Sequence, residues 1–144
     1  MENLKNYTTI ISASQTISEI QELLSGYGVS AMMTEFEGRQ VSAVSFKMDV
    51  GGKQMGFRLP CHWRGVLEVF HKQGITRVKH KDKDQENQAI RTAWRIILNW
   101  IDAQLALVEV NMVTIPQVFL PYTIMGDGRT LAEHVDTNPS FLLQ

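Results

Sequence analysis

The first 60 residues combine two hydrophobic periods. Residues 7–11 form a β-branched and aromatic run that predicts a strand. Residues 14–24 carry isoleucines and leucines at three- and four-residue spacing, which predicts an amphipathic helix with Ser14 as its N-cap. From Val29 the pattern alternates, and two glycine-containing turns divide it into three strands. We therefore expect a strand, a helix and an antiparallel meander, with the first strand as a candidate neighbour of that meander.

The period becomes helical again in the second half of the chain. Residues 63–73 predict a second helix, 75–78 are a candidate edge strand, and the hydrophilic residues 79–84 predict a loop. After this loop comes a stretch of more than 25 residues without Gly or Pro. It predicts a long helix that begins at Asp84, its expected N-cap, and ends near residue 112.

Two apolar stripes follow neighbouring faces of this long helix, one containing Trp94 and the other Trp100. A surface helix needs only one stripe, and a buried aromatic side chain removes about 150–250 Å² from water, so the second stripe also requires a cover. We expect a homodimer in which a second copy covers it. If the chain is a monomer, residues 114–122, predicted as a helical turn and extended strap, are the cover. The residues assigned to the helix core or an oligomer interface are Trp94, Ile97, Trp100, Ile101, Leu105 and Val108.

Together these elements predict a single α+β domain over residues 1–144, with a small antiparallel sheet packed against a long hydrophobic helix in the C-terminal half. The predicted order begins β-α-β-β-β within residues 1–60. A helix and basic loop follow in 61–83, then the long helix in 84–112, and then the strap and a tail with one short helix in 113–144.

The composition is that of a folded protein. Of the 144 residues, 44 % are hydrophobic and 20 % are charged, which is enough to build a core without metal or disulfide support. The single cysteine and seven methionines suit a reducing compartment. Residues 1–20 lack the pattern of a signal peptide, and residues 96–112 are interrupted by polar side chains, so no membrane span is predicted. We expect a cytoplasmic protein.

Charge is distributed unevenly along the chain. Residues 58–95 contain nine Lys or Arg and four Asp or Glu, a net charge of +5, whereas the whole chain has a net charge of −1. A concentration of cations of this kind favours phosphate contacts, although the alternative of a solvated loop stays open. The candidate nucleic-acid-binding residues are Arg77, Lys79, His80, Lys81, Lys83, Arg91 and Arg95.

Other polar motifs give no catalytic or metal site. Cys61 and His62 are adjacent in sequence, but neighbours on an extended chain point to opposite sides. The four histidines lack metal-ligand spacing, and the acidic residues 82–86 lack the glycine and distal glutamate of a calcium loop. Gly51 and Gly52 fit a hairpin turn better than a phosphate-binding loop. We therefore expect no catalytic residue, no metal and no cofactor.

Residues 89–131 resemble small uncharacterised proteins encoded by tailed phages and prophages. The similarity lies in the Ala93-Trp94-Arg95 run, in residues 119–122 and in residues 128–131. The resemblance implies a phage or mobile-element origin and action in the host cytosol, and it implies no activity. Two hypotheses follow: a non-enzymatic accessory protein that binds nucleic acid or a nucleoprotein complex, or an inhibitor of a host defence protein. The inhibitor would act, in the manner of anti-CRISPR proteins, by protein contact or by sequestering a nucleotide signal.

Overall fold

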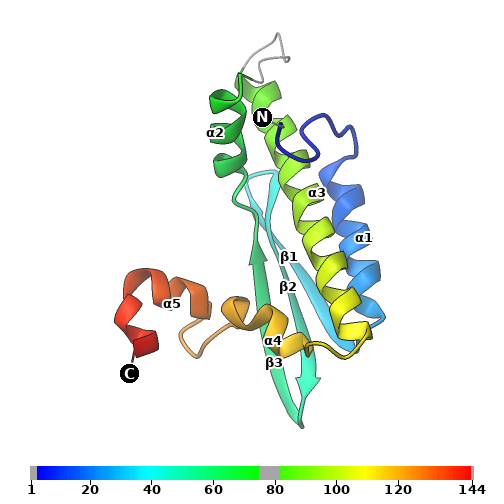
Figure 1. Cartoon of the computed structure of the whole chain (residues 1–144), viewed down its shortest axis with the longest axis vertical. Coiled ribbons are helices and arrows are strands. Elements are labelled where there is room, and N and C mark those ends of the chain that lie inside the picture. Colours follow the sequence, from blue (N-terminus) through cyan, green and yellow to red (C-terminus); the bar gives the residue numbers. More distant parts are fainter. Residues whose placement is uncertain (1–2, 75–81, 144) are drawn as a thin grey trace. The chain divides into compact units, whose positions relative to one another are not determined.

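The computed structural model describes residues 3–74 and 82–143 (Figure 1). The elements in chain order are α1 (Ala13–Ser25), β1 (Val29–Glu37), β2 (Gln40–Val50), β3 (Lys53–Pro60), α2 (Trp63–Lys72), α3 (Asp82–Glu109), α4 (Ile115–Phe119), the 3-10 helix η1 (Leu120–Tyr122), α5 (Leu131–Thr137) and the 3-10 helix η2 (Pro139–Leu143). The α+β class is confirmed, with an antiparallel sheet and a long helix in the C-terminal half.

The chain divides into two compact units. Unit 1 contains residues 1–22 and 61–103, and unit 2 contains residues 23–60 and 104–144. Each of the helices α1 and α3 therefore contributes residues to both units. The predicted single domain stays a prediction, and each unit is described by itself below.

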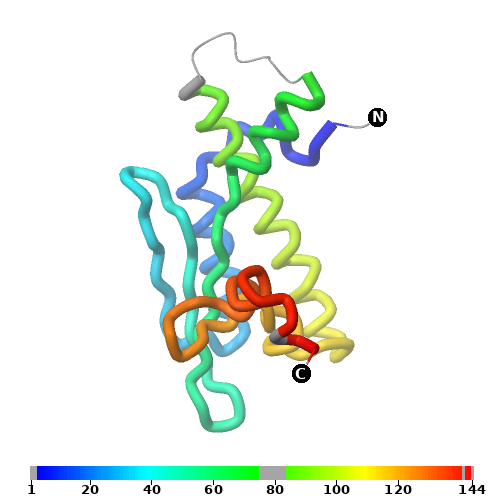
Figure 2. Tube along the Cα trace, turned by 90° about the vertical axis from the view of Figure 1, so that its left-hand side faces the viewer, coloured from blue at the N-terminus to red at the C-terminus, as the bar shows by residue number. Residues whose placement is uncertain are grey.

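Unit 2 contains the three-stranded sheet in the order β1-β2-β3 (Figure 2). The alternating pattern predicted this meander correctly. Met33 is paired with Ser45, and Ser45 in turn with Arg58, so these three side chains share one face of the sheet. Phe46 and Phe57 are also cross-strand partners and lie on the opposite face. The β1–β2 pairing shifts register near both ends of β1.

The core of unit 2 includes three aromatic rings. The centroids of Phe46 and Phe57 are 5.2 Å apart, and Phe119 from α4 meets Phe46 edge-on with centroids 5.3 Å apart. All three side chains are at most 1 % exposed. A capping box starts α4, because the Thr114 hydroxyl accepts from the Gln117 amide and the Gln117 side chain accepts from the Thr114 amide. The predicted helical turn is thereby confirmed, and it brings Phe119 to the sheet. The extended strap predicted to follow it is wrong for residues 120–122, which form the 3-10 helix η1.

The segment after η1 adds to the free edge of β3. Thr123 forms an isolated antiparallel bridge with Phe57, and the Ile124 amide donates to the Gly56 carbonyl across 2.8 Å. A side chain at position 56 would meet the Ile124 side chain at 3.3 Å, so glycine permits this close approach. Within residues 3–74 and 82–143, no strand pairs with the outer edge of β1.

In unit 1 the prediction of a strand at residues 7–11 is wrong. These residues form a turn and irregular backbone, because side chains from α3 rather than a strand satisfy their carbonyls. Gln88 donates to the carbonyls of Tyr7 and Thr9 at 3.0 and 2.9 Å, and Thr92 donates to the Asn6 carbonyl at 3.0 Å. The β-branched run has no neighbouring strand among the described residues.

The boundaries of the helices in unit 1 differ slightly from the prediction. The cap of α1 is Ser12 rather than Ser14, since the Ser12 hydroxyl accepts from the Gln15 amide at 3.1 Å. Helix α2 agrees with the prediction. Helix α3 begins at Asp82, so Asp84 lies inside the helix and is not its cap.

The remaining predictions concern the second half of the chain. Helix α3 ends at Glu109 rather than near 112, and Asn111 follows in a left-handed conformation with φ of 62°. The predicted short helix is confirmed as α5, with Thr130 as its cap. The candidate edge strand at 75–78 lies outside the described residues. No helix in the part of the chain that the structure describes is long and apolar enough to cross a membrane.

Candidate functional site

Most of the predicted basic segment lies outside the described residues. This applies to Arg77, Lys79, His80 and Lys81. Lys83 belongs to the first turn of α3, and only its backbone is described. Their role in binding therefore stays a prediction based on charge.

The two helix arginines of the predicted site make intramolecular contacts in unit 1. Arg91 donates to the side-chain carbonyl of Gln88, the residue that holds the N-terminal segment. Arg95 forms an ion pair with Glu19 of α1, and its side chain is only 20 % exposed. Guanidinium groups that are already engaged in this way are poor candidates for phosphate contacts. The candidate residues that remain are those of the α2–α3 connection and Lys83.

The described residues on both sides of this connection support a basic surface. Arg64 is exposed on α2 and lies over the Trp63 ring, 4.5 Å from its centroid, and Lys72 is exposed in the last turn. His71 Nε2 lies 3.3 Å from the Gln85 side-chain oxygen, which ties the end of α2 to the start of α3.

The residues predicted for the core of the long helix divide into two groups. Trp94, Ile101 and Leu105 are at most 2 % exposed and belong to the core, as expected. Ile97, Trp100 and Val108 are half-buried. On the second stripe exposure rises towards the C-terminal end of α3, where Leu107 is 37 % exposed. An oligomer interface on this helix stays a prediction.

Cys61 does not have the properties of a nucleophile. Its side chain is buried, and this burial raises the pKa of the thiol to about 12, although a hydrogen bond from the Trp63 backbone partly opposes the shift. The thiol is therefore protonated at neutral pH and cannot supply a thiolate. The neighbouring His62 is exposed.

The other polar motifs have structural positions. Gly51 and Gly52 form the β2–β3 turn with positive φ angles of 59° and 85°. The acidic residues 82–86 belong to α3 rather than to a calcium loop. Among the described residues no group of three His, Cys, Asp or Glu side chains is placed to hold a metal ion.

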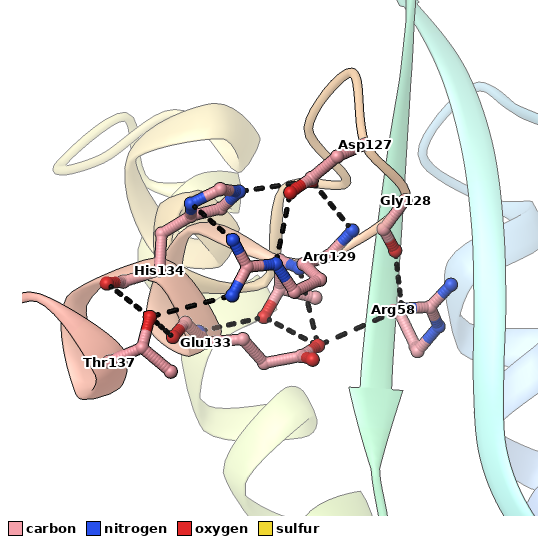
Figure 3. Close-up of polar contacts among 8 residues, drawn as sticks. Arg58, Asp127, Gly128, Arg129, Glu133, His134 and Thr137 are labelled. Atoms are coloured by element: carbon pink, nitrogen blue, oxygen red, sulfur yellow. Dashed lines mark hydrogen bonds and ion pairs between the residues drawn. The ribbon is translucent and has the colours of Figure 1, made fainter.

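A polar cluster that the sequence patterns did not indicate joins the turn at 126–128 to α5 (Figure 3). His134 Nε2 lies 3.0 Å from Asp127 Oδ1, and Arg129 Nε donates to Asp127 Oδ2 across 2.9 Å. Arg129 Nη2 lies 3.4 Å from His134 Nδ1. Because a guanidinium only donates, Nδ1 accepts here and the imidazole proton on Nε2 is donated to Asp127. We call these three residues the α5 cluster.

Electrostatics in the α5 cluster favour an ionised carboxylate. The hydrogen bond from His134 lowers the pKa of Asp127 well below its usual range, and the backbone and side-chain N–H groups of Arg129 add to this effect. The nearby Thr137 hydroxyl donates to backbone carbonyls of α5 and is not directed at the histidine as a nucleophile. The cluster fits an anchor for α5 better than a catalytic centre.

Arg58 connects this anchor to the sheet within unit 2. It donates to the Gly128 carbonyl at 2.9 Å and to Glu35 of β1 at 3.2 Å, and it lies 3.7 Å from Glu133 of α5. Two carboxylates thus share one guanidinium, which leaves this part of the sheet face with excess negative charge.

A cavity of about 290 Å³ lies on the β1–β2 part of unit 2. Its walls are almost entirely apolar, and Lys47 is its only charged lining residue. The Ser45 hydroxyl is buried and has no hydrogen-bond partner within the described residues. The lining residues are Ala31, Met32, Met33, Ser45, Phe46, Lys47 and Ile124. The alternating sequence pattern predicts that most of these residues lie on strands. Ile124 is the exception, because it reaches the cavity only through the contacts of residues 123–124 with β3.

Comparison with known proteins gives no relative: no protein-family model, curated protein or solved structure matches this chain.

Proposed function

We propose that this chain is a non-enzymatic accessory protein of a phage or mobile element that binds nucleic acid or a nucleoprotein complex through the α2–α3 connection. The observation that carries the proposal is the net charge of +5 over residues 58–95, in a chain whose net charge is −1. Phosphate contacts by clustered Lys and Arg provide affinity without any requirement for a catalytic pocket.

The neighbouring helices support this position. His71 and Gln85 tie the end of α2 to the start of α3, and Lys72 at this end of α2 is exposed. In the sequence, Arg77, Lys79 and Lys81 follow Lys72 within nine residues. Several cations close together along a chain attract an anion more strongly than isolated charges do.

The test is binding of a fluorescent DNA duplex and of a single strand at several salt concentrations. With four phosphate contacts the slope of log K against log salt for duplex is expected to be about −3 to −4. Reversal of Lys79, Lys81 and Lys83 to Glu is expected to weaken binding at least about tenfold and to reduce this slope.

The matched control is the variant with Lys5→Glu, Arg39→Glu and Lys53→Glu, which changes the net charge by the same amount at exposed positions elsewhere. It is expected to bind like the wild type apart from a small general loss. Equal affinity of the two triple variants for DNA would contradict the proposal. So would the absence of binding to both the duplex and the single strand at low salt.

Protein contact with a host factor is the second candidate function. It is favoured by the exposed apolar side chains of β1, since Met33 is 58 % and Phe36 is 63 % exposed. A pull-down from host lysate with and without nuclease separates the two candidates. Partners that nuclease releases support the nucleic-acid proposal, whereas a partner that persists after nuclease and is lost with Phe36→Ser supports protein contact.

A further inference from the structure

Strand β1 is the uncovered edge of the sheet in unit 2. It contains nine residues and, in the described part of the chain, pairs only with β2, whereas the opposite edge, on β3, is joined by Thr123 and Ile124. Edge strands expose unpaired N–H and C=O groups that act as a template for another strand. Natural proteins protect such edges with charged side chains, especially Lys, with Pro or with bulges. Strand β1, with the sequence VSAMMTEFE, contains no Lys or Pro, and its glutamates and register shifts lie at or beyond the ends of residues 31–35.

We propose that two copies of this chain pair antiparallel through β1 and form a continuous six-stranded sheet. This proposal is independent of nucleic-acid binding at the α2–α3 connection, and it places a second copy on the β1 surface that the second candidate function assigns to a host factor. The argument uses three properties of β1: its register, its exposed apolar side chains and the charges beside it.

The register follows from the irregularities in β1. Its pairing with β2 shifts between Val29 and Ala31 and again between Glu35 and Phe36, so the regular part is residues 31–35. The midpoint of this part is Met33. A two-fold axis at Met33 pairs the regular part with itself over its full length, with Met33 opposite Met33 and Ala31 opposite Glu35 of the second copy.

The side chains at this axis are those expected of an interface. Met33 is 58 % exposed and lines the apolar cavity together with Ile124. Directly opposite residues in an antiparallel pair lie on the same face of the sheet, so the Met33 side chains of both copies meet there. Each Met33 side chain would cover apolar surface of the other copy that is exposed to water in a monomer.

The charges on this face are complementary between copies. Lys47 is the cross-strand partner of Ala31, and no described carboxylate pairs with it. In the proposed register Ala31 lies between Lys47 and Glu35 of the second copy, whose Cα atoms are two strand spacings apart, about 9.6 Å. The small alanine allows the two long side chains to meet. Within its own copy Glu35 contacts Arg58 at 3.2 Å, so the contact with Lys47 requires the Glu35 side chain to turn from Arg58 towards the second copy. Glu133, 3.7 Å from Arg58, then remains as the carboxylate beside this guanidinium.

The first experiment is sedimentation of the full chain over a concentration range from about 1 μM to about 1 mM. The wild type is expected to be dimeric at the upper end, and Met33→Lys, which brings two ammonium groups to the axis, is expected to raise the dissociation constant at least about tenfold. Met112→Lys is the matched control, because Met112 is 71 % exposed and lies at the end predicted for the long helix. A monomer at every concentration, or a dimer that Met112→Lys but not Met33→Lys dissociates, overturns the proposal.

The second experiment exchanges the charges. Lys47→Glu and Glu35→Lys should each weaken self-association, since like charges then face each other across Ala31. When the two variants are mixed, the introduced glutamate of one chain faces the introduced lysine of the other, and the two native side chains also face each other, so a heterodimer is expected. Circular dichroism checks that each variant is folded, because Glu35→Lys also faces Arg58. Absence of a heterodimer from two folded variants contradicts the proposed register.

Hydrogen exchange of the wild type gives a readout without mutation. Amides on the outer edge of β1 are expected to gain protection as the protein concentration rises, while amides of η2 remain unchanged. Protection that appears on α3 instead would place the interface on the long helix and contradict the β1 proposal.

Discussion

The two units hold their irregular segments in different ways. In unit 1, residues 3–12 have no regular structure and depend on side chains of α3, chiefly Gln88 and Thr92, to satisfy their backbone carbonyls. In unit 2, the segment after α4 carries its own anchors: Phe119 enters the aromatic core, and Thr123 and Ile124 extend the sheet.

This difference indicates which contacts stabilise the irregular segment of each unit. A few polar side chains hold the N-terminal segment of unit 1, so the loss of one leaves partly buried carbonyls without donors. The C-terminal segment of unit 2 is held by apolar burial and backbone hydrogen bonds together, so the loss of one polar contact removes a smaller fraction of its support. The following predictions test this contrast, from the largest expected effect to the smallest.

The largest effect is expected in unit 1 from Trp94→Ala. Trp94 is completely buried, so its truncation leaves a large cavity and is expected to lower the free energy of unfolding by about 3–5 kcal/mol. Urea unfolding followed by circular dichroism measures it. Trp94→Phe is the control and should cost less, because the indole N–H has no hydrogen-bond partner to lose among the described residues. If Trp94→Ala lowered the free energy of unfolding by less than about 1 kcal/mol, Trp94 would not be a core residue.

In unit 2 the comparable substitution is Phe119→Leu. It keeps most of the buried volume but removes the edge-on contact with Phe46, and we expect a loss of about 1–3 kcal/mol. Leu120→Ala is a suitable control, because that neighbouring side chain is 50 % exposed and should matter little. Equal costs for both variants, measured by urea unfolding, would show that the aromatic core does not anchor α4.

The polar anchoring of unit 1 is tested by Gln88→Leu. The variant leaves the carbonyls of Tyr7 and Thr9 without their donor, at an expected cost of about 1–3 kcal/mol. Hydrogen exchange should show faster exchange in the N-terminal segment. Gln85→Leu, which removes only the contact with His71, is the control on the same helix. An unchanged exchange rate in residues 3–12 would mean that Gln88 does not hold them.

A smaller effect is expected from the cap of α5. The Thr130 hydroxyl accepts from the Glu133 amide at 3.2 Å, so Thr130→Ala should destabilise the protein by about 1 kcal/mol. Thr130→Ser keeps the hydroxyl and is expected to restore most of this stability in thermal or urea unfolding. If Ser were no better than Ala, the capping hydrogen bond would not be the cause.

The smallest and most local effect is the pH dependence of α5. Because the pKa of Asp127 is lower in the folded protein, its ionised form contributes stability above its unfolded value of about 3.9, and this contribution is lost as the pH falls through the lower folded value. Exchange of the α5 amides should therefore accelerate only in strong acid. In Asp127→Asn the same amides should exchange faster already at neutral pH. Acid acceleration that persists in this variant would point to another carboxyl group.

Local patterns were sufficient to predict most elements of both units. The three strands, their turns and helices α1, α2 and α5 follow from the spacing of apolar residues and from nearby glycines, threonines and serines, which act over a few residues. The burial of Trp94 and Ile101 follows in the same way, because side chains at helical spacing necessarily share one face of α3.

Only the tertiary structure decided the contacts between distant residues. Nothing in the β-branched run at 7–11 indicates that Gln88, 81 residues away from Tyr7, would take the place of a neighbouring strand. Spacing alone also did not separate an arginine available to phosphate from one that, like Arg95, is paired with Glu19. Hydrogen bonds and ion pairs of this kind depend on which surfaces meet once the chain is folded, and periodicity along a single segment contains no information about the partner segment.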